Sequence, residues 1–105
     1  MTNNWSDIVL QNTLQPQTVE EAVERLITVM EDRHKILLSI LKEDDLIDLH
    51  FGLGLSIRNA FGLHDANRKL LRDCGSDTPD DASGVIIKAL WNKLKHEDWE
   101  REGNR

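Results

Sequence analysis

The sequence predicts an all-α fold, a compact antiparallel bundle of four to five helices with a nearly all-round apolar helix at about 45–61 near its centre. Three observations support this prediction. No stretch of the 105 residues alternates apolar and polar side chains for long enough to form a strand. Apolar residues recur at helical spacing along most of the chain. Glycine and proline, which commonly interrupt helices, are rare in the chain, and the range 17–51 contains neither.

The first helix is predicted to begin at Thr18, whose hydroxyl can cap it while Glu21 completes a capping box. Asp32 could cap a second helix, or the first helix could continue to 42, because the apolar pattern permits both. We favour a break. The range 1–17 is predicted to be an N-terminal extension that packs on the body. The core face of the first helix comprises Val19, Ala22, Val23, Leu26, Ile27 and Met30.

The segment at 45–61 is predicted to start at a cap on Asp44 or Asp45 and to stop at Gly62. Its residues fall into rows spaced by four, which share a face of a helix. Apolar side chains occur in nearly every row, so we expect its neighbours to bury it all round. A row of small residues would let another helix approach closely. The main apolar row is Leu49, Leu53, Ile57 and Phe61, and the small row is Gly52, Ser56 and Ala60.

Two further helices follow. A short one is predicted between a cap on Asp65 and a stop at Gly75, and a long one between Thr78, its cap, and the region of His96. The resulting domain spans 18–101, and 102–105 form a frayed tail. The predicted core stripe of the last helix is Ala82, Val85, Ile86, Ala89, Leu90 and Leu94.

Charge and composition narrow the possible partners. The net charge is −6, whereas nucleic-acid-binding domains usually present a basic face, so we expect no nucleic-acid partner. No uncharged apolar run approaches the roughly 20 residues of a membrane span, so we expect no membrane partner. The lone cysteine, Cys74, suits a reducing compartment, and the N-terminus lacks the features of a secretory signal. We therefore expect a cytoplasmic protein.

No motif predicts a catalytic residue, a cofactor or a metal. The "GLG" run lacks the third glycine of a dinucleotide fingerprint, since position 57 is Ile57, and follows no strand. Glu31 and His34 form a single E-x-x-H pair, more typical of a solvated turn than of a metal site. Cys74 near the end of a short helix is interpreted as a small buried hydrophobe rather than a nucleophile.

One polar cluster can be interpreted in two ways. Arg58 lies deep in an apolar segment and needs a partner, for which Asp80 and Asp81 are candidates. His50 lies two turns earlier on the same face, and Asn59 is adjacent. The cluster is either a structural network that ties helix ends together or a pocket for a small molecule or a peptide carboxylate.

Three tryptophans are candidates for an interface. Trp91 is predicted to be core, with Trp5 and Trp99 covering the open edge of the bundle. The alternative is an exposed aromatic patch, because tryptophan is enriched in protein interfaces.

The motif "HFGLGLSIRN.FGL", followed by "PDDAS..I...LW..L", resembles a family of small bacterial all-helical domains of uncharacterised function. The match covers His50–Leu63, Pro79–Ser83 and, loosely, "TVEEAVERL". The resemblance implies the all-helical fold and no reaction. Phe61 departs from it, because the family pattern has a tryptophan there.

These observations favour a non-enzymatic, cytoplasmic protein-interaction module that binds another protein or a second copy of itself. A narrower version is an immunity or antitoxin-type protein that neutralises a basic partner, which the acidic charge motivates. The alternative function is a small-molecule or peptide-carboxylate binding domain that uses the polar cluster around Arg58.

Overall fold

The computed structural model describes residues 15–64 and 67–96, and every regular element in these ranges is a helix. Five are α-helices, and two elements of tighter and wider winding lie between the second and the third. In chain order they are α1 (Val19–Val29), α2 (Asp32–Ile40), the 3-10 helix η2 (Glu43–Leu49), the π-helix η3 (His50–Gly54), α3 (Leu55–Ala60), α4 (Arg68–Asp73) and α5 (Pro79–His96).

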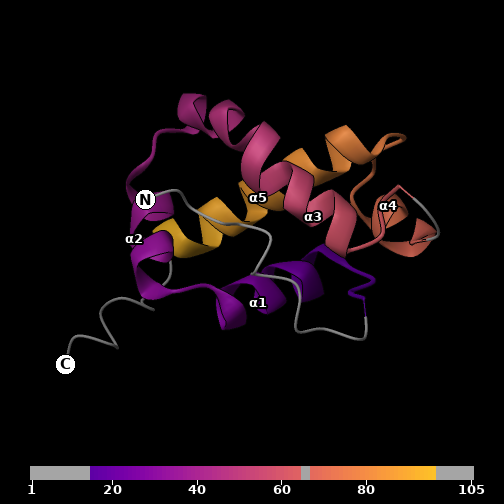
Figure 1. The fold of residues 1–105 in the computed structure, drawn as a ribbon, viewed down its shortest axis with the longest axis horizontal. Coiled ribbons are helices and arrows are strands. Elements are labelled where there is room, and N and C mark those ends of the chain that lie inside the picture. Colours follow the sequence, from indigo (N-terminus) through magenta and orange to yellow (C-terminus); the bar gives the residue numbers. More distant parts are fainter. Residues whose placement is uncertain (1–14, 65–66, 97–105) are drawn as a thin grey trace.

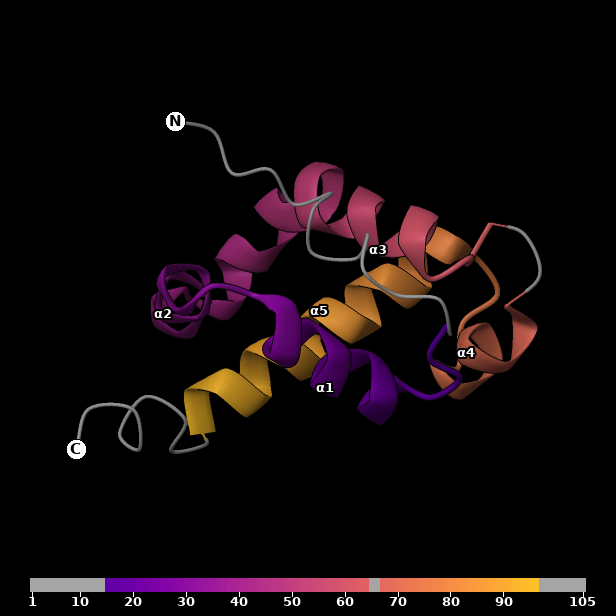
Figure 2. The ribbon, with the colours of Figure 1, turned by 60° about the horizontal axis from the view of Figure 1, so that its bottom comes forward.

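The long helix α5 holds the fold together. It contacts α1, α2, η2, η3 and α3, and Figures 1 and 2 show it passing between α1 on one side and α3 on the other. The predicted all-helical, closely packed fold is therefore confirmed. No helix in the described ranges has both the length and the apolar character needed to cross a membrane.

The start of α5 follows the predicted chemistry, but its buried face is broader. The Thr78 hydroxyl accepts a hydrogen bond from the Asp81 backbone N–H at 3.2 Å. Val85, predicted to be core, is 38% exposed. Because α5 is covered from more than one side, its buried band is rotated and wider than a single stripe. That band comprises Ala82, Ser83, Ile86, Ile87, Leu90, Trp91 and Leu94.

The predicted break between the first two helices is confirmed. The backbone is extended at Met30 and at Glu31, and Met30 is buried. The predicted cap on Asp32 is wrong, because Glu31 holds the N-cap position and makes no side-chain cap. The turn carries α2 onto α5 and directs Leu38 into the core.

The start of α1 is held by residues near and far along the chain. The Thr18 hydroxyl accepts from the Glu21 N–H at 3.1 Å, as predicted. The Glu21 carboxylate accepts from the backbone N–H of Gln17 at 2.8 Å, one residue earlier than a capping box requires. An Asp73 carboxylate oxygen accepts from the Val19 N–H at 2.7 Å, so the end of α4 helps to cap α1.

The range 43–60 differs from the single regular helix predicted to begin at a cap on Asp44 or Asp45. It starts as a 3-10 helix, widens to a π-helix and ends as an α-helix. Leu53, Ile57 and Phe61 are buried as predicted. The expectation of burial on all sides is wrong, because only the face toward α5 is covered. Ile47 is 74% exposed and Leu55 46% exposed.

The close approach between this segment and α5 is made by a different row of residues from the one predicted. Gly52 is exposed, whereas Gly54 is buried. A Cβ at Gly54 would lie 3.1 Å from an Arg58 Nη1 and 3.5 Å from the Ser83 Oγ. The missing side chain at Gly54, rather than the small row, therefore lets α5 come close.

One asparagine joins three segments. Asn67 caps α4 by accepting from the Leu70 N–H at 3.3 Å, so the predicted cap on Asp65, which lies outside the described residues, is wrong. Its side-chain amide donates to the carbonyls of Pro16 at 2.8 Å and Phe61 at 2.7 Å. Pro16 is fully buried, so this part of the predicted N-terminal extension is packed on the body.

Gly84→Ala is expected to raise the free energy of unfolding by about 1 kcal/mol, since glycine weakens a helix interior and a Cβ here would meet nothing within 4 Å. The matched substitution Gly62→Ala should lower it by about 1–2 kcal/mol. The backbone φ of Gly62 is +72°, and a Cβ there would lie 2.6 Å from the Gln15 side chain. Urea denaturation of both variants checks that stability rises in Gly84→Ala and falls in Gly62→Ala. A loss of stability in Gly84→Ala would contradict the finding that a side chain at this position meets no neighbour.

Asn67→Ala is expected to lower the free energy of unfolding by about 2–3 kcal/mol, because a cap and the two hydrogen bonds to the Pro16 and Phe61 carbonyls are lost. Asn67→Asp should be similarly destabilising. Aspartate caps helices as well as asparagine does, but it would place oxygen against the Pro16 and Phe61 carbonyls. If Asn67→Asp were as stable as the unsubstituted protein in thermal or urea unfolding, Asn67 would contribute to stability only as a cap.

Candidate functional site

Arg58, the centre of the predicted polar cluster, is buried against α5 with only 5% of its surface exposed. Its Nη1 donates to the Ser83 hydroxyl at 2.9 Å, and its Nε lies 3.4 Å from an Asp80 carboxylate oxygen. The Ser83 hydroxyl in turn donates to the Asp80 backbone carbonyl at 2.9 Å. The guanidinium therefore has partners on the first turn of α5, and this geometry favours the structural interpretation of the cluster.

Of the other predicted members, only Asp80 is shown in contact with Arg58. Asn59 and Asp81 are exposed, and the side chain of His50 lies outside the described residues. Sequence reasoning paired Arg58 with Asp80 but missed Ser83, the best-aligned acceptor. The sequence feature that could have identified Ser83 is its position as a small polar residue about one helical turn after Asp80. In the structure Ser83 lies on the side of α5 that faces Gly54.

Cys74 is poorly suited to nucleophilic chemistry. Burial, assisted by the negative charge of Asp73, raises the pKa of its thiol to about 11. The Sγ donates to the Ala82 carbonyl at 3.6 Å. At neutral pH the thiol is protonated, and the reactive thiolate is scarce.

The E-x-x-H pair is split between core and surface. His34 is buried, whereas Glu31 is exposed and pairs with Arg33 at 2.7 Å. The prediction of a solvated turn is therefore wrong for the histidine. Within residues 15–64 and 67–96 no three histidine, cysteine or carboxylate side chains are grouped so that they could hold a metal ion.

Trp91 packs in the interior, as predicted, rather than in an exposed aromatic patch. It is 8% exposed, and its indole N–H donates to the Leu41 carbonyl at 2.9 Å. The Lys95 ammonium lies 5.2 Å from the centre of its ring. Trp5 and Trp99 lie outside the described residues. Trp91 therefore locks α5 to the end of α2 and is not available to a partner.

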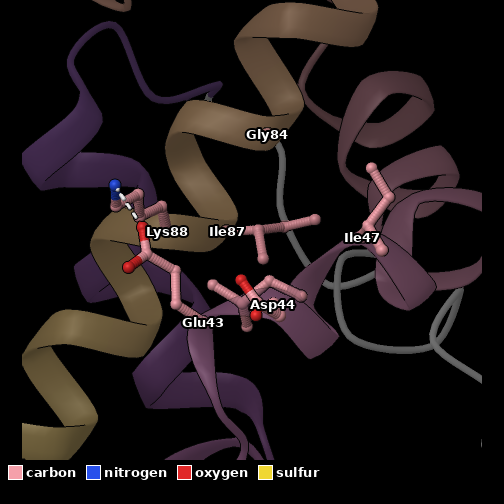
Figure 3. A pocket seen from close by; sticks show the side chains of 7 residues that line it. Glu43, Asp44, Ile47, Gly84, Ile87 and Lys88 are labelled. Atoms are coloured by element: carbon pink, nitrogen blue, oxygen red, sulfur yellow. Dashed lines mark ion pairs between the residues drawn. The ribbon is translucent and has the colours of Figure 1, made fainter.

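A second candidate site, which sequence reasoning missed, is a groove of about 350 Å³ between η2 and α5. Figure 3 shows Ile87 of α5 extending toward Ile47 of η2, with Asp44 near them and Gly84 at one end. The lining is mainly apolar. It comprises Glu43, Asp44, Leu46, Ile47, Gly84, Ile87 and Lys88.

The rim of the groove is acidic. Lys88 lies 2.6 Å from Glu43 and is neutralised by it (Figure 3). Of the exposed aspartates of η2, only Asp44 lines the groove. Residues three apart share a face of a 3-10 helix, so Asp45 and Asp48 lie on the face of η2 that does not line it. Because Glu43 and Lys88 pair with each other, Asp44 leaves the lining with a net negative charge.

The comparisons with known proteins identify the family and give no activity. The model of a family described as a domain of unknown function (DUF6794) matches residues 15–94, so the chain belongs to that family. The predicted membership of an uncharacterised helical family is thus confirmed. No curated protein and no solved structure matches the chain.

Ser83→Ala is expected to lower the free energy of unfolding by about 1–3 kcal/mol, because the buried Arg58 Nη1 loses its acceptor. Asp80→Asn should cost at most about 1 kcal/mol, since that carboxylate is 65% exposed. Ser39→Ala is the matched control. Its hydroxyl makes the same bond to the carbonyl three residues earlier, at 2.7 Å, and serves no arginine. Equal losses for Ser83→Ala and Ser39→Ala in urea denaturation would remove Ser83 from the arginine network.

Proposed function

We propose that this member of a family of unknown function is a protein-binding domain. It docks another protein on the exposed surface around the groove between η2 and α5. The observation that carries the proposal is the groove between Ile47 and Ile87, whose outer wall, Ile47, is 74% exposed.

Exposed apolar groups around a concavity are typical of interaction surfaces. Leu55, 46% exposed, adds aliphatic surface on α3. The chain retains these large side chains in water although the same segment buries Leu53 and Ile57, each two residues from Leu55. Burial of this face against a partner would release the water that it now orders.

Binding, rather than catalysis, is supported by the state of the reactive groups. The Cys74 thiol is protonated at neutral pH, because its pKa is about 11. Arg58, the buried cation at the centre of the predicted cluster, contacts Ser83 and Asp80. The same contacts leave the carboxylate-binding alternative at Arg58 without a supporting observation.

Site-specific photo-crosslinking in the host organism tests the proposal. The photoreactive residue benzoylphenylalanine replaces Ile47 in one variant and Thr28 in the control. Thr28 is exposed on α1 and does not line the groove. We expect a discrete adduct with another protein from position 47 and none from position 28.

Equal labelling from both positions, or no adduct from position 47, would contradict the proposal. Circular dichroism of the two purified variants shows whether each retains its helices. Both replaced side chains are exposed, so neither replacement should disturb the core.

A further inference from the structure

Gly84 stands in the middle of α5 without an internal reason to be glycine. The absent side chain at Gly54 makes room for Arg58 and Ser83, and Gly62 needs its positive φ of +72°. A Cβ at Gly84 would meet nothing within 4 Å, and the residue is exposed. Glycine weakens a helix interior relative to alanine, so the fold itself gains nothing from this choice.

Gly84 also lines the groove, beside Ile87 and opposite Ile47 (Figure 3). A missing side chain at the wall of an apolar groove lets the backbone of another chain come close, as glycine does where a ligand meets the main chain. The open space at Gly84 therefore indicates a crossing point for a segment from outside the domain.

The charges around the groove select the partner. Asp44 lines the groove and is exposed, Glu43 and Lys88 pair with each other, and the whole chain has a net charge of −6. A second copy of the chain would bring the same acidic surface against this one, which opposes association. A segment with lysine or arginine beside its apolar residues would be attracted instead.

We propose that the groove binds an amphipathic helix of another protein, with leucine-like side chains between Ile47 and Ile87, basic side chains toward η2, and its backbone crossing α5 at Gly84. Helices that bind in grooves present apolar anchors three and four residues apart, which suits this short apolar depression. The inference rests on the proposed function and specifies the chemistry of the partner.

The test uses two designed peptides of about 18 residues, or five helical turns, as probes. Both carry leucine on one face, and the polar positions are lysine in one and glutamate in the other. The full ¹⁵N-labelled chain is titrated with each peptide by NMR. We expect the lysine peptide to shift the amide signals of 43–48 and 83–88, with an affinity that falls as salt is raised.

Gly84→Leu, which fills the groove, should weaken binding of the lysine peptide by at least about tenfold. Asn92→Leu is the matched control, since it adds the same side chain to an exposed position of α5 outside the groove, and it should leave the affinity unchanged. Ile47→Lys, at a 74% exposed position that folding does not need, should repel the same peptide.

Each contrary result has a distinct meaning. Equal binding of the two peptides, shifts away from the groove, or no binding at about 1 mM peptide would overturn the inference. A dimer that sedimentation detects and Gly84→Leu abolishes would assign the groove to a second copy, which also overturns it. If any of the first three results were found, a cross-linked adduct at position 47 would still support the proposed function. Failure of the inference about the partner can therefore be distinguished from failure of the proposed function.

Discussion

Burial of α5 from more than one side is the constraint on which the rest of the structure depends. The elements around it have 11 residues or fewer, and α3 and α4 have only six each. Isolated helices shorter than about 12–15 residues are marginal in water. Their stability must come from packing, and the surface available for packing is the 18-residue α5. Each of these short elements is therefore stabilised by the apolar side chains that it packs into the shared core.

The Arg58 network shows how the packing accommodates a charge. An unpaired buried guanidinium is costly, yet Arg58 lies at the closest approach of η3 and α3 to α5. Gly54 supplies the space, Ser83 the acceptor and Asp80 the opposite charge. Breaking any of these would leave the arginine less well paired, so the network fixes the register of α3 along α5. A group that resembles a binding site in the sequence therefore serves the interior.

The range 43–54, which precedes α3, is only partly covered by α5. The backbone at 43–54 departs from α-helical winding, and its apolar residues divide between core and surface. Ile47 borders a groove between η2 and α5 that is also lined by the buried Ile87, and Gly84 leaves its wall open. The domain thus combines an interior held by Arg58 and the α5 core with an exposed surface of apolar and acidic groups.

Features that depend on residues close together in the sequence could be predicted from it. Thr18 and Thr78 cap their helices, Gly62 adopts a positive φ, and the break before Asp32 is present. Only the tertiary structure decided which groups more than 50 residues apart meet, and which side chains stay exposed. Asn67 binds the Pro16 carbonyl, Asp73 caps α1, and Ile47 is left in water. Local hydrogen bonds are encoded by neighbours in the chain, whereas long-range contacts depend on how every helix rotates against α5.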